Sequence, residues 1–250
     1  QWARENNIKT PTLYDIDFLL GVYDASRMGA LRFKTDPNGD FLDNNKTTPT
    51  PPWSSIRELQ VAAENIEDDK DNDEVKKWLS ILIAPGSSLG GARPKANILD
   101  TDKSLWIAKF PSKSGTIDKA AWEYLAYELA IQAGITMAPC RMEKIMGNYH
   151  TFFTKRFDRQ NGERIHFASA MTMTGNNEDT IKENHPSYLE IAEFISNHGV
   201  NIEANLHQLW RRIIFNISIS NTDDHLRNHG FILTDEGWTL SPAYDLNPSI

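Results

Sequence analysis

A polar loop followed by a hairpin, at residues 221–245, constrains this chain more than any other stretch (NTDDHLRNHGFILTDEGWTLSPAYD). Two short apolar runs, GFIL and WTL, flank Thr-Asp-Glu-Gly, a sequence typical of a hairpin turn. Because paired strands leave and return side by side, we expect Asn228 and Asp245 to lie close together. Their side-chain oxygens suit a hard cation such as Mg²⁺, with Asp223 beside them as a candidate base. An Asp- and Asn-rich surface turn explains the same residues equally well on local grounds.

The spacing within the loop matches the order of parts in a protein-kinase catalytic centre, an Asp-x4-Asn followed by a second Asp. Asp223 has this spacing to Asn228, whereas Asp224 is one position too close and is interpreted as a neighbour. A different interpretation is a metal-dependent hydrolase that uses these aspartates with His225 and His229, whose i, i+4 spacing fits one face of a helix. That interpretation leaves the upstream motifs unexplained.

Composition narrows the classes of protein. The chain has 250 residues, 40% of them hydrophobic and 24% charged, which is ordinary for a globular protein. A net charge of −8 argues against nucleic-acid binding by the whole chain, because phosphate contact needs a basic face. The single cysteine, Cys140, excludes an intramolecular disulfide, and neither a signal peptide nor a membrane-spanning run is found, so we expect a cytoplasmic protein. The chain lacks an initiator Met and stops soon after Asp245, and we expect it to be a fragment.

Residues 1–84 are expected to form a small α+β subdomain without a catalytic pattern. Strands and turns are expected in residues 11–34 and a loop in residues 35–52. A helix capped by a serine is expected through IRELQVAAENI, and a second one at residues 74–83.

A glycine-rich loop (GSSLGGARPKANIL, residues 86–99) is the next candidate for chemistry. Its glycines let the backbone approach an anion, and its serines, Arg93 and Lys95 add hydroxyls and positive charge, so it is a candidate phosphate-binding loop. It matches neither the Walker A spacing nor Gly-x-Gly-x-x-Gly, and a flexible surface loop remains an alternative.

A hairpin is expected from the apolar runs at residues 96–100 and 105–110. Lys109 lies in its second strand, either on a polar edge or directed at the phosphates of a nucleotide. The helix expected at residues 117–133 offers Glu123, and less favourably Glu128, as a partner for this lysine.

Two further strands are expected around the turn at Gly147-Asn148 within residues 141–159. The segment 154–158 follows as a hinge whose backbone can contact an adenine edge, with Phe157 against the base. Helices are then expected at residues 187–199 and 204–221. In the second, we expect one broad buried stripe that holds the following loop rigidly: Leu206, Leu209, Trp210, Ile213, Ile214 and Ile217.

Five of these motifs, SLGGARPKA, WIAKFPS, KRFDR, NTDDHLRN and PAYDL, occur in this order in HipA-like serine/threonine kinases. The chain therefore resembles the toxin components of bacterial HipBA toxin–antitoxin systems, from about Ser87 to Asp245. The resemblance implies an α+β, protein-kinase-like fold of two lobes behind an N-terminal α+β subdomain. The implied domains are residues 1–84, an N-lobe at 85–157, and a helical C-lobe at 158–250 that we expect to be incomplete.

The resemblance also implies roles for particular residues. Asp223 would be the catalytic base, Asn228 and Asp245 the Mg²⁺ ligands, and Lys109 a ligand of the ATP phosphates. The remaining nucleotide contacts would come from Ser88, Leu89, Gly90, Gly91, Lys155, Phe157 and His225. Ser88 matches the serine that the family autophosphorylates, with Ser87 as the adjacent alternative.

The implied acceptor is a protein serine or threonine, with glutamyl-tRNA synthetase as a candidate, and a small-molecule acceptor stays open. The implied partner is a basic helix-turn-helix antitoxin of the HipB kind, through which any contact with DNA would be indirect. A pseudokinase that only binds a partner is the remaining alternative, although the Asp, Asn, Asp and Lys set is intact.

Overall fold

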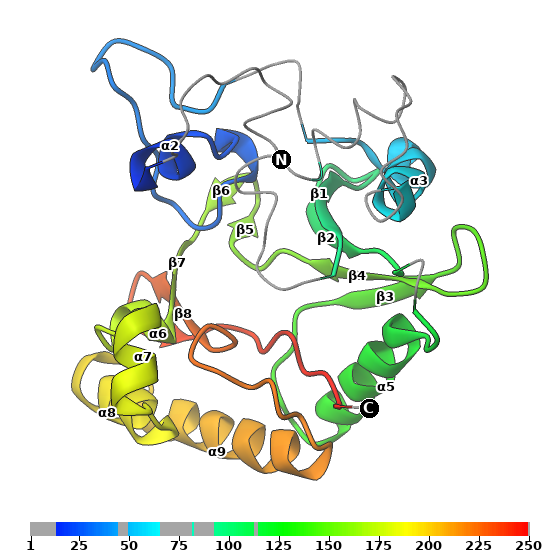
Figure 1. The fold of residues 1–250 in the computed structure, drawn as a ribbon. Coiled ribbons are helices and arrows are strands. Elements are labelled where there is room, and N and C mark those ends of the chain that lie inside the picture. Colours follow the sequence, from blue (N-terminus) through cyan, green and yellow to red (C-terminus); the bar gives the residue numbers. More distant parts are fainter. Residues whose placement is uncertain (1–13, 45–49, 66–81, 83–92, 113–114, 250) are drawn as a thin grey trace. The chain divides into compact units, whose positions relative to one another are not determined.

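A computed structural model describes residues 14–44, 50–65, 82, 93–112 and 115–249 (Figure 1). The chain divides into two compact units. The first contains the residues up to Ala121 together with Cys140–Arg156, and the second contains Trp122–Pro139 and Phe157–Ile250. The chain thus passes from one unit to the other between Arg156 and Phe157, inside the segment that we interpret as a hinge. The glycine-rich loop up to residue 92 lies outside the described residues, as does the helix expected at residues 74–83 apart from Leu82.

The N-terminal segment of the first unit begins with a helix, α2 (Asp15–Leu20), and a 3-10 turn, η1 (Asp24–Ser26). Our expectation of strands in residues 11–34 is wrong for the described part, where Phe33 forms only an isolated bridge with Leu42. A helix forms here because contacts within the first turn of α2 stabilise it. The Asp17 carboxylate accepts the N–H of Tyr14 at 2.9 Å, and acidic residues in a first turn favour a helix.

A four-stranded antiparallel sheet forms the centre of the first unit. Its strands are β1 (Lys95–Leu99), β2 (Leu105–Lys109), β3 (Cys140–Glu143) and β4 (Thr151–Lys155), in the order β1-β2-β4-β3. Both predicted hairpins are confirmed, and Gly147 in the second turn has a φ of 71°. Helix α3 (Ile56–Asn65), preceded by η2 (Trp53–Ser55), packs its apolar face on the sheet (Figure 1).

Arg156 fastens the N-terminal segment to this sheet. Its guanidinium is buried and donates to the Asn97 side chain at 2.8 Å and to the carbonyls of Ser26 and Arg27. Three acceptors satisfy a buried charge that is otherwise costly. The first unit is therefore one packed body in its described part.

The second unit combines helices with a small sheet. Helix α5 (Lys119–Gln132) is shared between the two units, and Gly134 follows it with a φ of 73°, as a C-terminal glycine does. The predicted hairpin is confirmed as β8 (Gly230–Thr234) and β9 (Gly237–Leu240), and β7 (His166–Ser169) adds a third, unforeseen strand beside β8. The other elements are β5 (Arg159–Gln160), β6 (Glu163–Arg164), α6 (Ala170–Met173), α7 (Glu178–Asn184), α8 (Tyr188–His198) and α9 (Ile202–Ser218).

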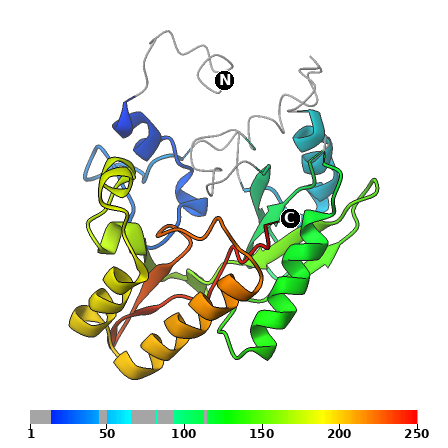
Figure 2. The same ribbon diagram turned by 60° about the horizontal axis from the view of Figure 1, so that its bottom comes forward.

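Helices α8 and α9 pack on this sheet through an apolar core (Figure 2). The predicted helices at residues 187–199 and 204–221 are confirmed, and Ser187 caps α8 in a capping box with Glu190. Within the described residues, no helix has the length and apolar character that crossing a membrane requires.

The stripe predicted on α9 is only half buried. Leu209 is 3% exposed, and Leu206 and Ile213 pack on the same core. Trp210, Ile214 and Ile217 are exposed by 61%, 45% and 68%, so the prediction that they are buried is wrong for the described chain. Periodicity marks the apolar arc of a helix, but the elements packed beside it decide how much of the arc is covered.

Candidate functional site

The segment from Ile219 to His229 connects α9 to β8 and contains no regular helix or strand. Leu226 anchors it, because its side chain is buried in the core beneath the sheet. The backbone is also held: the N–H groups of Ala170 and Met171 donate to the carbonyls of His229 and Leu226 at 2.8 and 3.2 Å. The loop is therefore fixed by α6 and by the core at its C-terminal half.

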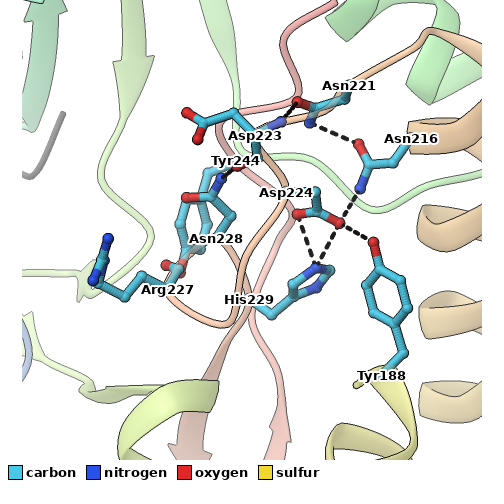
Figure 3. A network of polar contacts seen from close by, with 9 residues as sticks. All are labelled: Tyr188, Asn216, Asn221, Asp223, Asp224, Arg227, Asn228, His229 and Tyr244. Atoms are coloured by element: carbon cyan, nitrogen blue, oxygen red, sulfur yellow. Dashed lines mark hydrogen bonds and ion pairs between the residues drawn. The ribbon is translucent and has the colours of Figure 1, made fainter. Parts of the chain in front are cut away.

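The two adjacent aspartates of the loop have opposite environments (Figure 3). Asp223 is exposed and its carboxylate points away from the polar network, with no hydrogen bond to another described residue. The side chain of Asp224 is 4% exposed and points into the unit. Asp223 is thus open to a ligand, whereas Asp224 is occupied by the protein.

Three side chains surround the Asp224 carboxylate. The Tyr188 hydroxyl donates to it at 2.6 Å, the Asn216 amide at 2.7 Å, and His229 Nε2 lies 3.1 Å from both oxygens. A carboxylate only accepts hydrogen bonds, so His229 carries its proton on Nε2 here. These donors come from α8, from α9 and from the loop residue directly before β8, so Asp224 links the two helices to the end of its own loop.

Electrostatics keep Asp224 ionised. Burial by itself raises the pKa of the Asp224 carboxyl, but the hydrogen bond and charge of His229 and the bonds from Tyr188 and Asn216 outweigh it, so the pKa lies below its ordinary value. The pKa of Tyr188 is raised by burial and by its bond to Asp224, so the phenol remains a donor. At every pH near neutral, Asp224 is therefore an ionised carboxylate surrounded by hydrogen-bond donors.

A chain of hydrogen bonds leads from this network to Asp223 (Figure 3). Asn216 donates to Asp224 and accepts from the Asn221 amide at 3.0 Å. The Asn221 carbonyl oxygen in turn accepts the backbone N–H of Asp223 at 3.2 Å. The backbone of Asp223 is therefore held by Asn221, which is itself held by Asn216.

Asn228 and the segment of Asp245 are brought to the same loop. The Asn228 amide donates to the Asp223 carbonyl at 2.9 Å, which leaves its oxygen available for a cation. The Tyr244 hydroxyl donates to the Arg227 carbonyl at 2.8 Å, so the chain before Asp245 is tied to the residue before Asn228. This agrees with the approach of the two segments that the hairpin predicts.

The backbone of Asp245 lies in the left-handed region, with a φ of 60°. A non-glycine residue adopts this conformation at a cost, and such positions cluster at functional sites. The Asp245 carboxylate accepts the Asn247 amide at 3.2 Å. Oxygen donors from Asp245 and Asn228 are the ligand type that Mg²⁺ requires, so the residues present fit that cation.

Arg212 on α9 is a buried cation beneath the loop. It donates to the Ser241 carbonyl at 2.6 Å, while its Nε and Nη1 have no hydrogen-bond partner among the residues that the structure describes. Burial lowers the pKa of Arg212 to about 10, although the negative charge of the Asp224 carboxylate acts in the opposite direction. It therefore stays protonated at neutral pH and offsets the negative charge gathered around the loop.

The hydrolase interpretation finds no support in this geometry. His225 and His229 lie in a turn region instead of on a helix, and His229 Nε2 is already bound to Asp224. Across the ranges that the structure describes, no three His, Cys, Asp or Glu side chains are grouped closely enough to hold a metal ion.

The other predicted nucleotide ligands are distributed over both units. In the first unit, Lys109 is buried with its ammonium 5.6 Å from the centre of the Phe152 ring, and Lys155 lies 3.8 Å from the Asp102 carboxylate. In the second unit, Phe157 stacks on Tyr244 with ring centres 5.9 Å apart, and Nδ1 of His225 is buried with no hydrogen bond to the described part of the chain. Ser87, Ser88, Leu89, Gly90 and Gly91 lie outside the described residues.

Glu123 is buried and Glu128 is exposed. The preference for Glu123 as the partner of Lys109 stays a prediction.

The support beneath the loop does not follow from the sequence patterns. These patterns make Tyr188, Asn216 and Arg212 ordinary helix residues, and Asp224 a neighbour. One signal is present: Asn216 and Arg212 are polar residues at helix positions that turn toward the core together with Leu209. Buried polar side chains need partners, so such positions indicate a network.

A small antiparallel sheet unit and a helical unit that carries Asp-x4-Asn before a hairpin define the class: an α+β protein of the protein-kinase-like fold. The model of the HipA-like C-terminal domain matches residues 87–250, so the chain belongs to that family and the assignment made from its motifs is confirmed.

Known proteins are similar to this chain. The HipA chain in the complex of Shewanella oneidensis HipA, HipB and operator DNA superposes with a TM-score of 0.64 at 19% identity, over 98% of this chain and 60% of that chain, and shares its fold. The Helicobacter pylori proinflammatory kinase CtkA has a TM-score of 0.46 at 17% identity, over 62% and 54% of the two chains. A Haemophilus influenzae protein named "Putative kinase" is 26% identical over 179 residues, which are 64% of this chain and 52% of that protein. The chain thus spans about half the length of its curated relative.

Proposed function

We propose that the protein containing this chain is an ATP- and Mg²⁺-dependent kinase that phosphorylates a serine or threonine hydroxyl of a protein. Asp223 accepts the proton of the acceptor hydroxyl, and Asn228 and Asp245 hold Mg²⁺. When bound, the cation supplies charge stabilisation for the phosphoryl group in transfer. Such chemistry depends mainly on positioning and electrostatics, which a rigid loop provides.

In this proposal, the nucleotide is held by the residues that match the family motifs. Lys109 binds the α- and β-phosphates, the glycine-rich segment that includes Ser88 covers them, and the backbone of residues 155–157 contacts adenine. Residues 85–157 then act as the N-lobe and residues 158–250 as part of the C-lobe, behind the subdomain of residues 1–84.

The different environments of Asp223 and Asp224 carry the proposal. Only the carboxylate with the four-residue spacing to Asn228 is exposed, and the Asn228 amide is fixed on the carbonyl of that same residue at 2.9 Å. The alternative carboxylate is occupied by three donors. A base must reach the hydroxyl from which it takes a proton, and of the two aspartates only Asp223 can do so.

The test is phosphate transfer by the protein as the cell makes it. We expect incubation with ATP and Mg²⁺, followed by intact mass measurement and peptide mapping, to place a phosphate on Ser88, and we expect Asp223→Asn to abolish it. Asp235→Asn, at the exposed hairpin tip, is the matched control and should retain transfer. Mg²⁺-ATP binding without transfer to the protein itself or to any lysate protein would indicate a binding module, and Zn²⁺-dependent hydrolysis without ATP would indicate the hydrolase.

Membership of the HipA-like family supports a proposal for the partner and for the acceptor. The solved HipA is in complex with HipB and operator DNA. We infer a helix-turn-helix antitoxin as the partner of this acidic protein in the cytoplasm, with DNA contacted only through it, and glutamyl-tRNA synthetase is the first acceptor to test. Co-purification with the product of a neighbouring helix-turn-helix gene checks the first, and labelling of purified synthetase with ATP checks the second.

A further inference from the structure

We propose that Asp224 is a positioning residue for phosphoryl transfer: its buried carboxylate holds the loop so that Asp223 and Asn228 face the substrates. This inference rests on the proposed function for its kinetic consequence. Its structural consequence, a loop that loses its fixed conformation when Asp224 is removed, is independent of any activity.

The contacts of Asp224 come from two helices and from its own loop. Its carboxylate accepts from Tyr188 on α8, from Asn216 on α9 and from His229 directly before β8, at 2.6–3.1 Å. Tyr188 lies 36 positions from Asp224 in the sequence, Asn216 eight and His229 five, and the three side chains meet at one carboxylate (Figure 3). Removal of that carboxylate leaves three buried donors without an acceptor, which a protein tolerates poorly.

A path of hydrogen bonds connects Asp224 to the exposed residues. Asn216 can donate to Asp224 and accept from Asn221 at the same time only in one orientation of its amide. That orientation fixes Asn221, whose oxygen holds the Asp223 N–H, and the Asp223 carbonyl in turn holds the Asn228 amide. Each bond in the series is made by a group whose other end is already fixed, so the buried carboxylate restrains the backbone of Asp223 and the amide of Asn228.

The backbone at Asp224 gives the loop its shape. The side chains of consecutive residues 223 and 224 point in opposite directions, one to solvent and one to the core (Figure 3). With Asp224 held inward, Asp223 can only face outward. The hydrogen bonds that hold Asp224 inward therefore leave Asp223 accessible to a substrate.

Two substitutions separate positioning from chemistry. Asp224→Asn keeps the size and an acceptor oxygen for Tyr188 and Asn216, and its amide can face His229 if the imidazole proton moves to Nδ1, which is buried and without a partner. Asp224→Ala loses all three bonds. We expect the alanine variant to lower kcat by about 100-fold, as a displaced catalytic group does, and the asparagine variant by about threefold or less, with the KM for ATP within about twofold in both.

A protease readout reports the loop directly. Arg227 is exposed within the loop, and its carbonyl oxygen accepts the Tyr244 hydroxyl at 2.8 Å, a bond that restrains the peptide bond that trypsin cleaves. We expect tryptic cleavage after Arg227 to be at least about tenfold faster in Asp224→Ala, while cleavage after Lys103 in the exposed β1–β2 turn serves as the internal reference. Tyr188→Phe, which removes one donor from a partly exposed ring, should give an intermediate rate and keeps the test valid if the alanine variant does not fold.

The outcomes are distinct. Loss of transfer and of protection in Asp224→Ala, with both retained in Asp224→Asn, supports the proposal. An asparagine variant as inactive as the alanine variant, with an intact loop, would make Asp224 part of the chemistry and overturn it. Wild-type transfer and protection in Asp224→Ala would also overturn it. If no version transfers phosphate but the cleavage rates follow this order, the proposed function fails and the positioning role stands.

Discussion

Two consecutive residues of one type perform two different tasks in this chain. Asp223 and Asp224 have the same carboxylate, and only the donors around them differ. Burial by itself raises the pKa of the Asp224 carboxyl, but the three donors around it outweigh that effect, and the pKa is lowered. The sequence distinguishes the two only through the spacing to Asn228, because two of the three donors to Asp224, Tyr188 and Asn216, lie on helices whose approach no local pattern predicts.

Gly134 permits a test of a single residue at the C-terminal end of α5. Its φ is 73°, and a Cβ there would meet the guanidinium of Arg211, which donates to the carbonyls of Ala133 and Gly134 just after the helix. We expect Gly134→Ala to lower the free energy of unfolding by about 1–2 kcal/mol, from the left-handed conformation and from displacement of this flexible side chain.

Gly175 is the matched control for this substitution. It lies in the same unit with a φ of 72°, and a Cβ added to it would have no neighbouring atom within 4 Å. Gly175→Ala should cost about 1 kcal/mol, from backbone conformation alone. Urea denaturation of both variants gives the comparison, and an equal cost would show that the contact with Arg211 contributes nothing.

Among the helices and strands, α9 shows what periodicity can and cannot predict. Its existence and its core side follow from the spacing of Leu206, Leu209 and Ile213. The exposure of Trp210, Ile214 and Ile217 does not, because it depends on what packs beside the helix. The hairpins are predictable because a short turn joins their strands. In contrast, β7 pairs with β8 across some sixty residues, and no local turn sequence predicts this pairing.

Two substitutions on α9, one on its buried side and one on its exposed side, test this difference in exposure. We expect Leu209→Ala to lower the free energy of unfolding by about 2–4 kcal/mol, because it removes a buried side chain and leaves a cavity. Ile214→Ala, on the same helix and 45% exposed, should cost less than about 1 kcal/mol, since alanine also favours the helix. Urea denaturation followed by circular dichroism measures both. A large loss for Ile214→Ala would mean that this face is covered in solution.

For the molecule as a whole, the ionisable groups set the pH range of stability. The pKa of Asp100 is lowered chiefly by its 2.6 Å bond from Arg141, and that of Asp224 by its donors. A carboxyl whose folded pKa is depressed stabilises the protein above its unfolded pKa, and this contribution is lost as pH falls through the folded value. Tyr188 has the opposite sign: its raised pKa means that stability is present below the unfolded value of about 10 and declines above it.

The loss of stability at acid pH is the easier of the two effects to test, because Asp100 can be substituted without changing a residue of the candidate site. Its partner Arg141 also lies over the rings of Trp53 and Trp106, 4.3 and 4.4 Å from their centres, so the carboxylate fixes a cation that joins α3 to the sheet through η2. We expect the free energy of unfolding of the wild type to fall between about pH 5 and pH 3. Asp100→Asn should lower it by about 1 kcal/mol at neutral pH and flatten that fall. Urea denaturation at a series of pH values, with Asp235→Asn as control, gives both quantities; a fall of unchanged slope at acid pH in Asp100→Asn would show that the bond to Arg141 does not depend on ionisation.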